Sequence, residues 1–171
     1  TIQWQSSTDN STFTNMTGTG VTTATLPAAT IGALTATKYF RAVVTNTPCP
    51  SVISNVVTVT VNSLPVITIN PALTAQTLCQ DPTLTANSYS VSATAGSGTI
   101  SSYSWYRNAN NSNIGGTFLV TNTSSSGSNS YLHSRTTASE FYYYCIVTNS
   151  NGCIATSSPF GSVKVIATPT I

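Results

Sequence analysis

The side chains that could carry acid–base chemistry are few and lie far apart along the chain. Its 171 residues include five Lys or Arg, three Asp or Glu and a single His. General acid–base catalysis needs titratable groups placed in pairs or triads. The acids are Asp9, Asp81 and Glu140, and His133 lies in a stretch that alternates like a strand, without a G-x-S-x-G turn. We therefore expect no catalytic residue, and we expect His133 to face solvent on a strand.

The same inventory argues against a metal, a cofactor or a nucleic-acid partner. Zinc sites need closely spaced Cys or His pairs and calcium sites need several carboxylates in one loop, and neither pattern occurs. The Gly-containing segment 95–98 precedes a predicted strand and not a helix, so it does not fit a phosphate loop. The net charge of +2 is too small and scattered for a nucleic-acid footprint. No apolar run is long enough for a membrane span.

The elements that would position these side chains repeat along the chain. Segment 36–46 matches segment 138–149 with one insertion, and Trp4 matches Trp105 at an offset of 101 residues. Other matched positions lie up to 104 residues apart. The period of about one hundred residues is the size of an immunoglobulin-like sandwich.

The repeat predicts three domain segments. Residues 64–168 form a complete unit, with 41 residues before its Trp. Residues 1–63 have only three residues before theirs, so we expect the C-terminal part of a repeat that lacks its N-terminal strands. Residues 169–171 resemble the start of a following repeat. We expect a piece of a tandem array, in which each unit contacts its neighbours through a short, Pro-containing, semi-rigid link.

Alternation of β-branched and hydroxylated residues, as in segment 57–61, predicts an all-β fold of tandem immunoglobulin-like β-sandwiches. The branched side chains suit a pleated surface better than a helix. In the second unit we expect strands near 66–70, 89–95, 102–108, 117–121, 129–135, 141–148 and 160–167. In the first unit we expect strands near 1–6, 20–26, 38–45 and 54–62.

Three aromatic residues are predicted to anchor the cores. Trp4 and Trp105 lie on equivalent strands, where a large aromatic fills the space between two sheets. Tyr143 should point inward beside Trp105.

A second aromatic group is predicted on the outer face of the same sheet. Tyr106, Tyr142 and Tyr144 should lie there with Arg107 nearby, and exposed aromatic rings can stack on sugars. The alternative is ordinary cross-strand pairing of tyrosines, which favour strands.

The second unit contains Cys79, Cys145 and Cys153, so one of them has no partner within the unit. The last hairpin is predicted to turn around 150–151. It then places Cys145 opposite residue 156 or so, too far from Cys153 for a disulfide without distortion.

The internal repeat separates the remaining pairings. Cys153 has a counterpart in Cys49, whereas Cys145 is replaced by Ala42. We therefore predict a Cys79–Cys153 disulfide, an oxidising compartment and a buried Cys145 thiol. The rival pairing is Cys79–Cys145, which would resemble the antibody-type bridge between sheets.

With these residues in place, the chain resembles the tandem immunoglobulin-like repeats of very large Bacteroidota surface adhesins. These include gliding-motility adhesins of the SprB type, which are exported by the type IX secretion system. A Cys before strand B commonly accompanies the hairpin Cys in that family, so the resemblance also implies the Cys79–Cys153 pair. Asp81 departs from the usual Gly. The segments that carry the resemblance are 4–13, 34–45, 49–51, 54–59, 78–80 and 151–153.

We therefore expect a fragment of a secreted cell-surface adhesin attached to the outer membrane, acting as a stalk or adhesive segment in attachment or gliding motility. Its expected partners are neighbouring repeats of the same chain, together with surface polysaccharide or the secretion and motility machinery. The alternative is a carbohydrate-binding or spacer module of a secreted multidomain hydrolase. The parent sequence distinguishes the two: dozens of repeats indicate an adhesin, and a catalytic domain indicates an accessory module.

Overall fold

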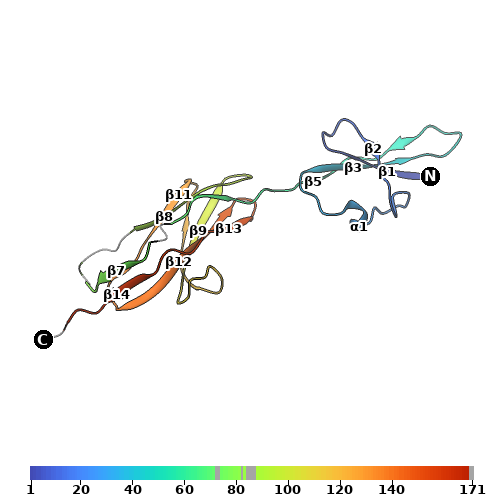
Figure 1. Ribbon diagram of the computed structural model, residues 1–171. Coiled ribbons are helices and arrows are strands. Elements are labelled where there is room, and N and C mark those ends of the chain that lie inside the picture. Colours follow the sequence, from blue (N-terminus) through green and yellow to red (C-terminus); the bar gives the residue numbers. More distant parts are fainter. Residues whose placement is uncertain (72–73, 82, 84–87, 170–171) are drawn as a thin grey trace. The chain divides into compact units, whose positions relative to one another are not determined.

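The computed structural model describes residues 1–71, 74–81, 83 and 88–169. The chain divides into two compact units, Thr1–Asn62 and Ser63–Ile171 (Figure 1). Described regular structure is β apart from one short helix, α1 (Ala28–Ile31). The predicted all-β fold is therefore confirmed. Residues 170–171, in the predicted start of a third unit, lie outside the described residues.

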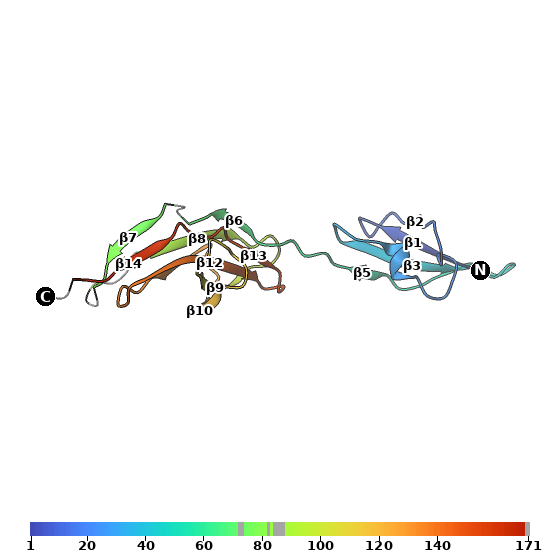
Figure 2. The same ribbon diagram turned by 60° about the horizontal axis from the view of Figure 1, so that its bottom comes forward.

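The second unit is a sandwich of two sheets, and Figure 2 shows β6 and β8 on one side of it and β9 and β10 on the other. The larger sheet runs β10-β9-β12-β14-β7, and β13 also pairs with β12. The smaller sheet runs β11-β8-β6. The large-sheet strands are β7 (Gln76–Cys79), β9 (Ile100–Asn108), β10 (Thr117–Thr123), β12 (Ser139–Asn149), β13 (Ile154–Thr156) and β14 (Val163–Ile166). The small-sheet strands are β6 (Val66–Ile69), β8 (Ser88–Thr94) and β11 (Ser128–Leu132).

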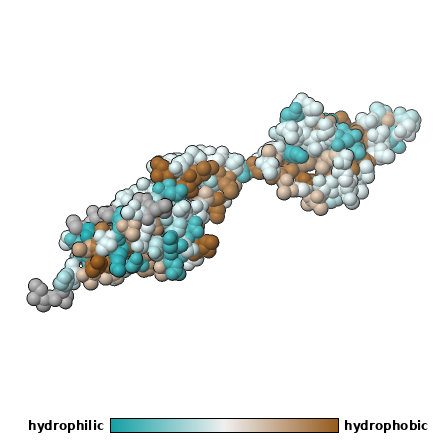
Figure 3. All heavy atoms as spheres, viewed as in Figure 1, coloured by the Kyte–Doolittle hydropathy of each residue, from teal (hydrophilic) through white to brown (hydrophobic). Residues whose placement is uncertain are grey.

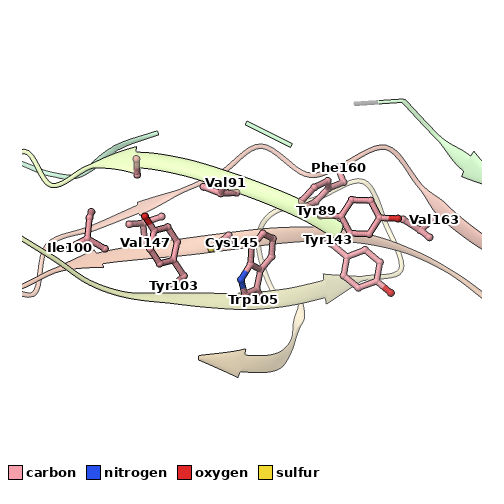
Figure 4. Packing of buried hydrophobic residues seen from close by; sticks show 11 residues of the cluster. Tyr89, Val91, Ile100, Tyr103, Trp105, Tyr143, Cys145, Val147, Phe160 and Val163 are labelled. Carbon is pink, nitrogen blue, oxygen red and sulfur yellow. The ribbon is translucent and has the colours of Figure 1, made fainter. Parts of the chain in front are cut away.

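Aromatic side chains fill the space between these sheets (Figure 4). Trp105 is fully buried and Tyr143 is 2% exposed, so both lie in the core, as strand alternation predicts. The indole N–H of Trp105 donates to Asn129 Oδ1 at 2.9 Å, which satisfies its one polar atom. Phe160 reaches in from the β13–β14 connection and packs edge-on against Tyr89, with ring centroids 4.7 Å apart.

The first unit contains a single described sheet of five strands. Its order is β2-β1-β3-β4, and β5 also pairs with β3. The strands are β1 (Ile2–Ser7), β2 (Thr14–Asn15), β3 (Lys38–Val44), β4 (Val52–Ile53) and β5 (Val57–Val59).

The strand predicted near 20–26 is absent from the described first unit. Gly20 has φ +79°, in the region that favours glycine, and the Thr23 hydroxyl donates to the Gly20 carbonyl at 2.9 Å. Pro27 then precedes α1. Turn chemistry therefore overrides the β propensity of the threonines in this segment.

Both units use the same strand register around the matched tryptophans. Trp4 is paired with Ala42 across β1 and β3, and Trp105 is paired with Cys145 across β9 and β12. The repeat seen in the sequence is thus also a repeat of strand pairing.

A serine breaks the last strand in the same way in both units. Ser54 N–H donates to the Ala42 carbonyl at 2.9 Å, while its Oγ accepts from Ala42 N–H at 2.9 Å. Ser157 makes the same two bonds with Cys145, at 2.9 and 3.0 Å. Each serine hydroxyl also donates to the carbonyl of the next residue. The structural period at this bulge is 103 residues, from Ser54 to Ser157.

The strand expected near 160–167 corresponds to β14, and the preceding strand β13, which pairs with β12, was not predicted. Thr156 pairs with Ile146 on β12, which confirms the predicted hairpin turn to within a residue. The sequence did not predict β7, which pairs in parallel with β14.

Candidate functional site

A cavity of about 130 Å³ lies at one end of the second sandwich, between β9, β12 and the segment that follows β11. Its lining includes Arg107, Tyr131, His133, Ser139 and Tyr143. His133, the chain's single histidine, and Arg107 both line this cavity.

His133 is buried at the inner end of this cavity, with 5% of its surface exposed. The predicted solvent-facing position is therefore wrong. Tyr131 faces the core from β11, so His133, two residues later, faces the same way. Leu132 points outward between them and is 59% exposed. The apolar Leu132 therefore faces solvent and the polar His133 faces the core, which is the reverse of the expected arrangement.

One imidazole nitrogen of His133 is hydrogen-bonded and the other is not. Nδ1 lies 2.6 Å from the Tyr143 hydroxyl oxygen. Nε2 is buried and has no hydrogen-bond partner among the described residues. Burial lowers the pKa of His133 below its ordinary value of 6.5, and Arg107 and Arg135 lower it further. The ring is therefore neutral near pH 7.

Tyr143 fixes the tautomer of that neutral ring. Burial raises the pKa of its phenol, so it keeps its proton. Among the described residues its hydroxyl has His133 Nδ1 as its hydrogen-bond partner. The phenol O–H therefore donates to Nδ1. The proton of the neutral imidazole is then on Nε2, which is a donor without an acceptor.

Arg107 supplies the positive charge of the cavity. It lies two residues after Trp105 on β9 and points to the inner face, not to the outer face with Tyr106, so its predicted placement on the tyrosine face is corrected. Its guanidinium carbon is 4.5 Å from the centroid of the Phe141 ring. Among the described residues this guanidinium forms no ion pair and no hydrogen bond.

The outer tyrosine face is largely covered. Tyr144 is 3% exposed, stacks on Tyr106 with centroids 5.1 Å apart, and its hydroxyl accepts from Gly116 N–H at 3.2 Å. Phe118 packs edge-on against Tyr106 at 5.6 Å. Tyr142 is half-buried. Cross-strand pairing, the alternative to a sugar-stacking face, accounts for this group, because Tyr144 and Tyr106 are direct strand partners.

No disulfide joins any two of the four cysteines, all of which lie in the described part of the chain. Cys79 is paired with Ile166 near the start of β12, whereas the Cys153 carbonyl accepts from Asn149 N–H at the end of β12. At roughly 3.3 Å per residue, β12 keeps the two cysteines about 30 Å apart, whereas a disulfide needs Cα atoms within about 7 Å. The predicted Cys79–Cys153 bridge is therefore corrected. Cys145 is fully buried, and burial raises the pKa of its thiol to about 12.

In the first unit, Trp4 is half-buried, in contrast to Trp105. Its indole N–H donates to the Thr23 carbonyl at 2.9 Å. An apolar groove of about 270 Å³ lies beside it, lined by residues that include Leu26, Phe40 and Val57. Trp4 thus anchors an apolar face that stays partly open.

Among the described residues, no three His, Cys, Asp or Glu side chains come together in a way that could hold a metal ion. No described helix is long and apolar enough to cross a membrane.

A family model described as a domain of unknown function (DUF8696) matches residues 1–63. Among curated proteins, no sequence matches this chain. One similar solved structure contains the fibronectin(III)-like modules of Clostridium thermocellum CbhA, at 14% identity and a TM-score of 0.39, and the match covers 96% of this chain and 77% of that one. Another contains the FN1–FN3 domains of chicken CNTN1, at 15% identity and a TM-score of 0.36, with 99% of this chain and 59% of that one covered. At these values neither likeness bears on the function of this chain.

Proposed function

We propose that the chain is a stalk segment of a secreted, cell-surface repeat adhesin. The observation that carries this proposal is the duplicated strand pairing: the Trp4–Ala42 and Trp105–Cys145 pairs, each followed by the same serine bulge. A unit that is repeated with its backbone register intact serves to add length, because each copy brings its own core and strand pairing.

The surface composition supports a spacer. Only 5% of the residues are charged, and about a third are Ser or Thr. Pale colour, which marks intermediate hydropathy, dominates the face seen in Figure 3. Hydroxyl groups keep such a surface hydrated without the long-range attraction or repulsion that charges produce.

We also propose that the first unit, residues 1–63, is the C-terminal part of a repeat, that residues 64–168 are a complete one, and that 169–171 begin the next. The groove beside Trp4 and Phe40 supports this assignment. In the second unit the equivalent face, at Trp105, is covered by the smaller sheet through residues such as Val91. Preceding strands would cover Trp4 in the same way.

We further propose that the chain is not an enzyme. His133 and Tyr143 hydrogen-bond to each other, and no carboxylate in the described residues hydrogen-bonds to either. A general base needs an orienting partner and a substrate proton within reach, and this pair lacks the orienting acid of a triad.

The experiment is a replacement in the parent gene of the source organism. The coding region for these residues is deleted in frame, or replaced by an unrelated pair of immunoglobulin-like modules, and surface attachment and gliding are measured. A stalk predicts that deletion weakens attachment and that the unrelated pair restores it. Restoration by the native sequence alone would contradict a spacing role.

The alternative, a spacer or carbohydrate-binding module of a secreted multidomain hydrolase, has a different outcome in the same strains. Deletion would then lower the turnover of a polysaccharide by the secreted protein and leave attachment unchanged.

A further inference from the structure

The cavity beside His133 has hydrogen-bond donors in excess. The guanidinium of Arg107 carries five N–H donors, and none of them forms a described hydrogen bond. The Nε2 atom of His133 also has no partner among the described residues, but it is closed off from solvent, so a ligand in the cavity does not reach it. The donors that a ligand can meet in the cavity are therefore those of Arg107.

The acids of the second unit do not fill that role. Among the described residues that line the cavity there is no Asp or Glu. Glu140 alternates to the other face of β12 and pairs with Lys164 at 3.7 Å. The other nearby cation, Arg135, is occupied, because its guanidinium donates to the Cys79 carbonyl at 2.8 and 3.1 Å. The positive charge of Arg107 is therefore uncompensated within the described cavity.

The rim of the cavity consists of hydroxyl groups. Ser134, Thr136 and Thr137 line its exposed side, and the Ser134 and Thr136 hydroxyls lie 3.0 Å apart. Inner donors with a hydroxyl rim suit a ligand that has an anionic end and several hydroxyls of its own. The planar fork of an Arg matches the two oxygens of a carboxylate in a bidentate geometry.

We propose that this cavity binds the carboxylate of an acidic sugar of the uronic acid class. The carboxylate accepts from Arg107, and the sugar hydroxyls meet the rim at Ser134, Thr136 and Thr137. This proposal is independent of the stalk role, because a stalk adds length whether or not the cavity binds a ligand.

The test exploits the single histidine, whose imidazole gives one set of NMR signals for His133 in the intact 171-residue chain. Sodium glucuronate is titrated into the chain, with glucose, sodium sulfate and N-acetyl-aspartate amide as the other arms. We expect glucuronate to shift the His133 signals saturably, with Kd in the range of about 1 mM that suits a small exposed site. Glucose should leave the signals unchanged.

A pair of matched variants links the shift to the cavity. Arg107→Gln removes one charge and should weaken glucuronate binding by roughly tenfold. Arg41→Gln is its control in the first unit, since Arg41 also lies over an aromatic ring, Phe13, at 3.9 Å, and it should leave binding unchanged.

Each remaining outcome overturns the proposal in a defined way. No saturable shift with glucuronate means that the cavity holds only water. Tighter binding of sulfate means a site for tetrahedral anions, and tighter binding of the aspartate amide means a site for acidic peptides. Equal losses in both variants would show that the shift reports net charge and not this cavity. If Arg107→Gln does not fold, the ligand arms on the native chain still decide.

Discussion

At the scale of single residues, one buried amide ties together the end of the second sandwich. Asn149 is 1% exposed, and its Nδ2 donates to the carbonyls of Ser63 and Ala95 at 3.1 and 2.9 Å. Its Oδ1 accepts from the N–H groups of Asn151 and Cys153 at 3.1 and 3.0 Å. All four hydrogen-bonding positions of the amide are used, which holds the last hairpin against the start of the unit.

Asn149→Asp should therefore destabilise the second unit by about 2 kcal/mol or more, because a carboxylate cannot donate to two buried carbonyls. Asn46→Asp is the matched control, since Asn46 is the exposed counterpart in the repeat and should change stability by less than about 0.5 kcal/mol. Urea unfolding followed by Trp105 fluorescence in a Trp4→Phe background measures the Asn149 variant, and Trp4 fluorescence in a Trp105→Phe background measures the Asn46 variant. Equal stabilities for the two variants would contradict the role given to Asn149.

His133 predicts how stability depends on pH. The pKa of His133 is lowered in the folded state, so the unfolded chain binds a proton more readily. The contribution of His133 to the stability of the folded state is complete above pH 6.5, the ordinary pKa of histidine. It is lost as the pH falls below that value. The charged and titratable groups that face it are Arg107, Arg135, Tyr131 and Tyr143.

The measurement is the free energy of unfolding of the second unit at pH 7.5 and at pH 5. We expect the free energy of unfolding of the native chain to be lower at pH 5 than at pH 7.5. In His133→Gln the difference between the two pH values should be smaller. An equal fall in the two chains would show that His133 is not buried in its neutral form.

Side-chain parity decided which residue positions could be predicted. Trp105, Tyr143 and Cys145 lie inside, as strand alternation indicated. His133 was misplaced because polarity was given more weight than the phase set by Tyr131. Arg107 shares the phase of Trp105, so alternation carried the signal that would have placed it inside.

At the scale of elements, the repeated serine bulge makes the last strand of each unit two short strands. Ser157 is fully buried and Ser54 is exposed, although both make the same hydrogen bonds. After the bulge the chain turns inward, so that the Phe160 side chain packs in the core. The Phe160 N–H donates to the Tyr143 carbonyl at 2.8 Å.

Ser157→Ala should destabilise the second unit by about 1–2 kcal/mol, because it leaves the buried Cys145 N–H without its hydroxyl acceptor. Ser54→Ala, the same change at the exposed copy, should cost the first unit less. Denaturant unfolding of both variants gives the comparison. A larger loss for Ser54→Ala would contradict the burial difference between the copies.

The position of β7 also determines whether Cys79 can form a disulfide with Cys153. The sequence did not indicate this strand, because parallel pairing of β7 with β14 depends on contacts between segments far apart in the chain. Once β7 lies beside β14, Cys79 and Cys153 are held at opposite ends of β12.

Thiol labelling under non-reducing conditions should therefore find four thiols per denatured chain. In the native chain, Cys49 and Cys79 should react quickly because they are exposed, and Cys145 should be protected by its burial. A non-reduced peptide that links Cys79 to Cys153 would contradict the position of β7 and restore the pairing predicted from the repeat.

At the scale of the whole molecule, composition and periodicity predicted the all-β fold and the repeat, because both depend on patterns that recur along the sequence. The spacing of the matched tryptophans was enough to locate equivalent strands in both units. The cavity could not be predicted in this way. His133 and Arg107 approach each other only through the packing of β11 against β9 and β12. The first unit has Ser6 at the position of Arg107 and no counterpart of His133 in its described strands.

The most direct test of the proposed stalk role is protease shaving of intact cells of the source organism, followed by mass spectrometry of the released peptides. The proposal predicts that peptides from both units, 1–62 and 63–171, are released before lysis and that a cytoplasmic marker protein is not. Release of these peptides only after the cells are lysed would contradict a surface stalk.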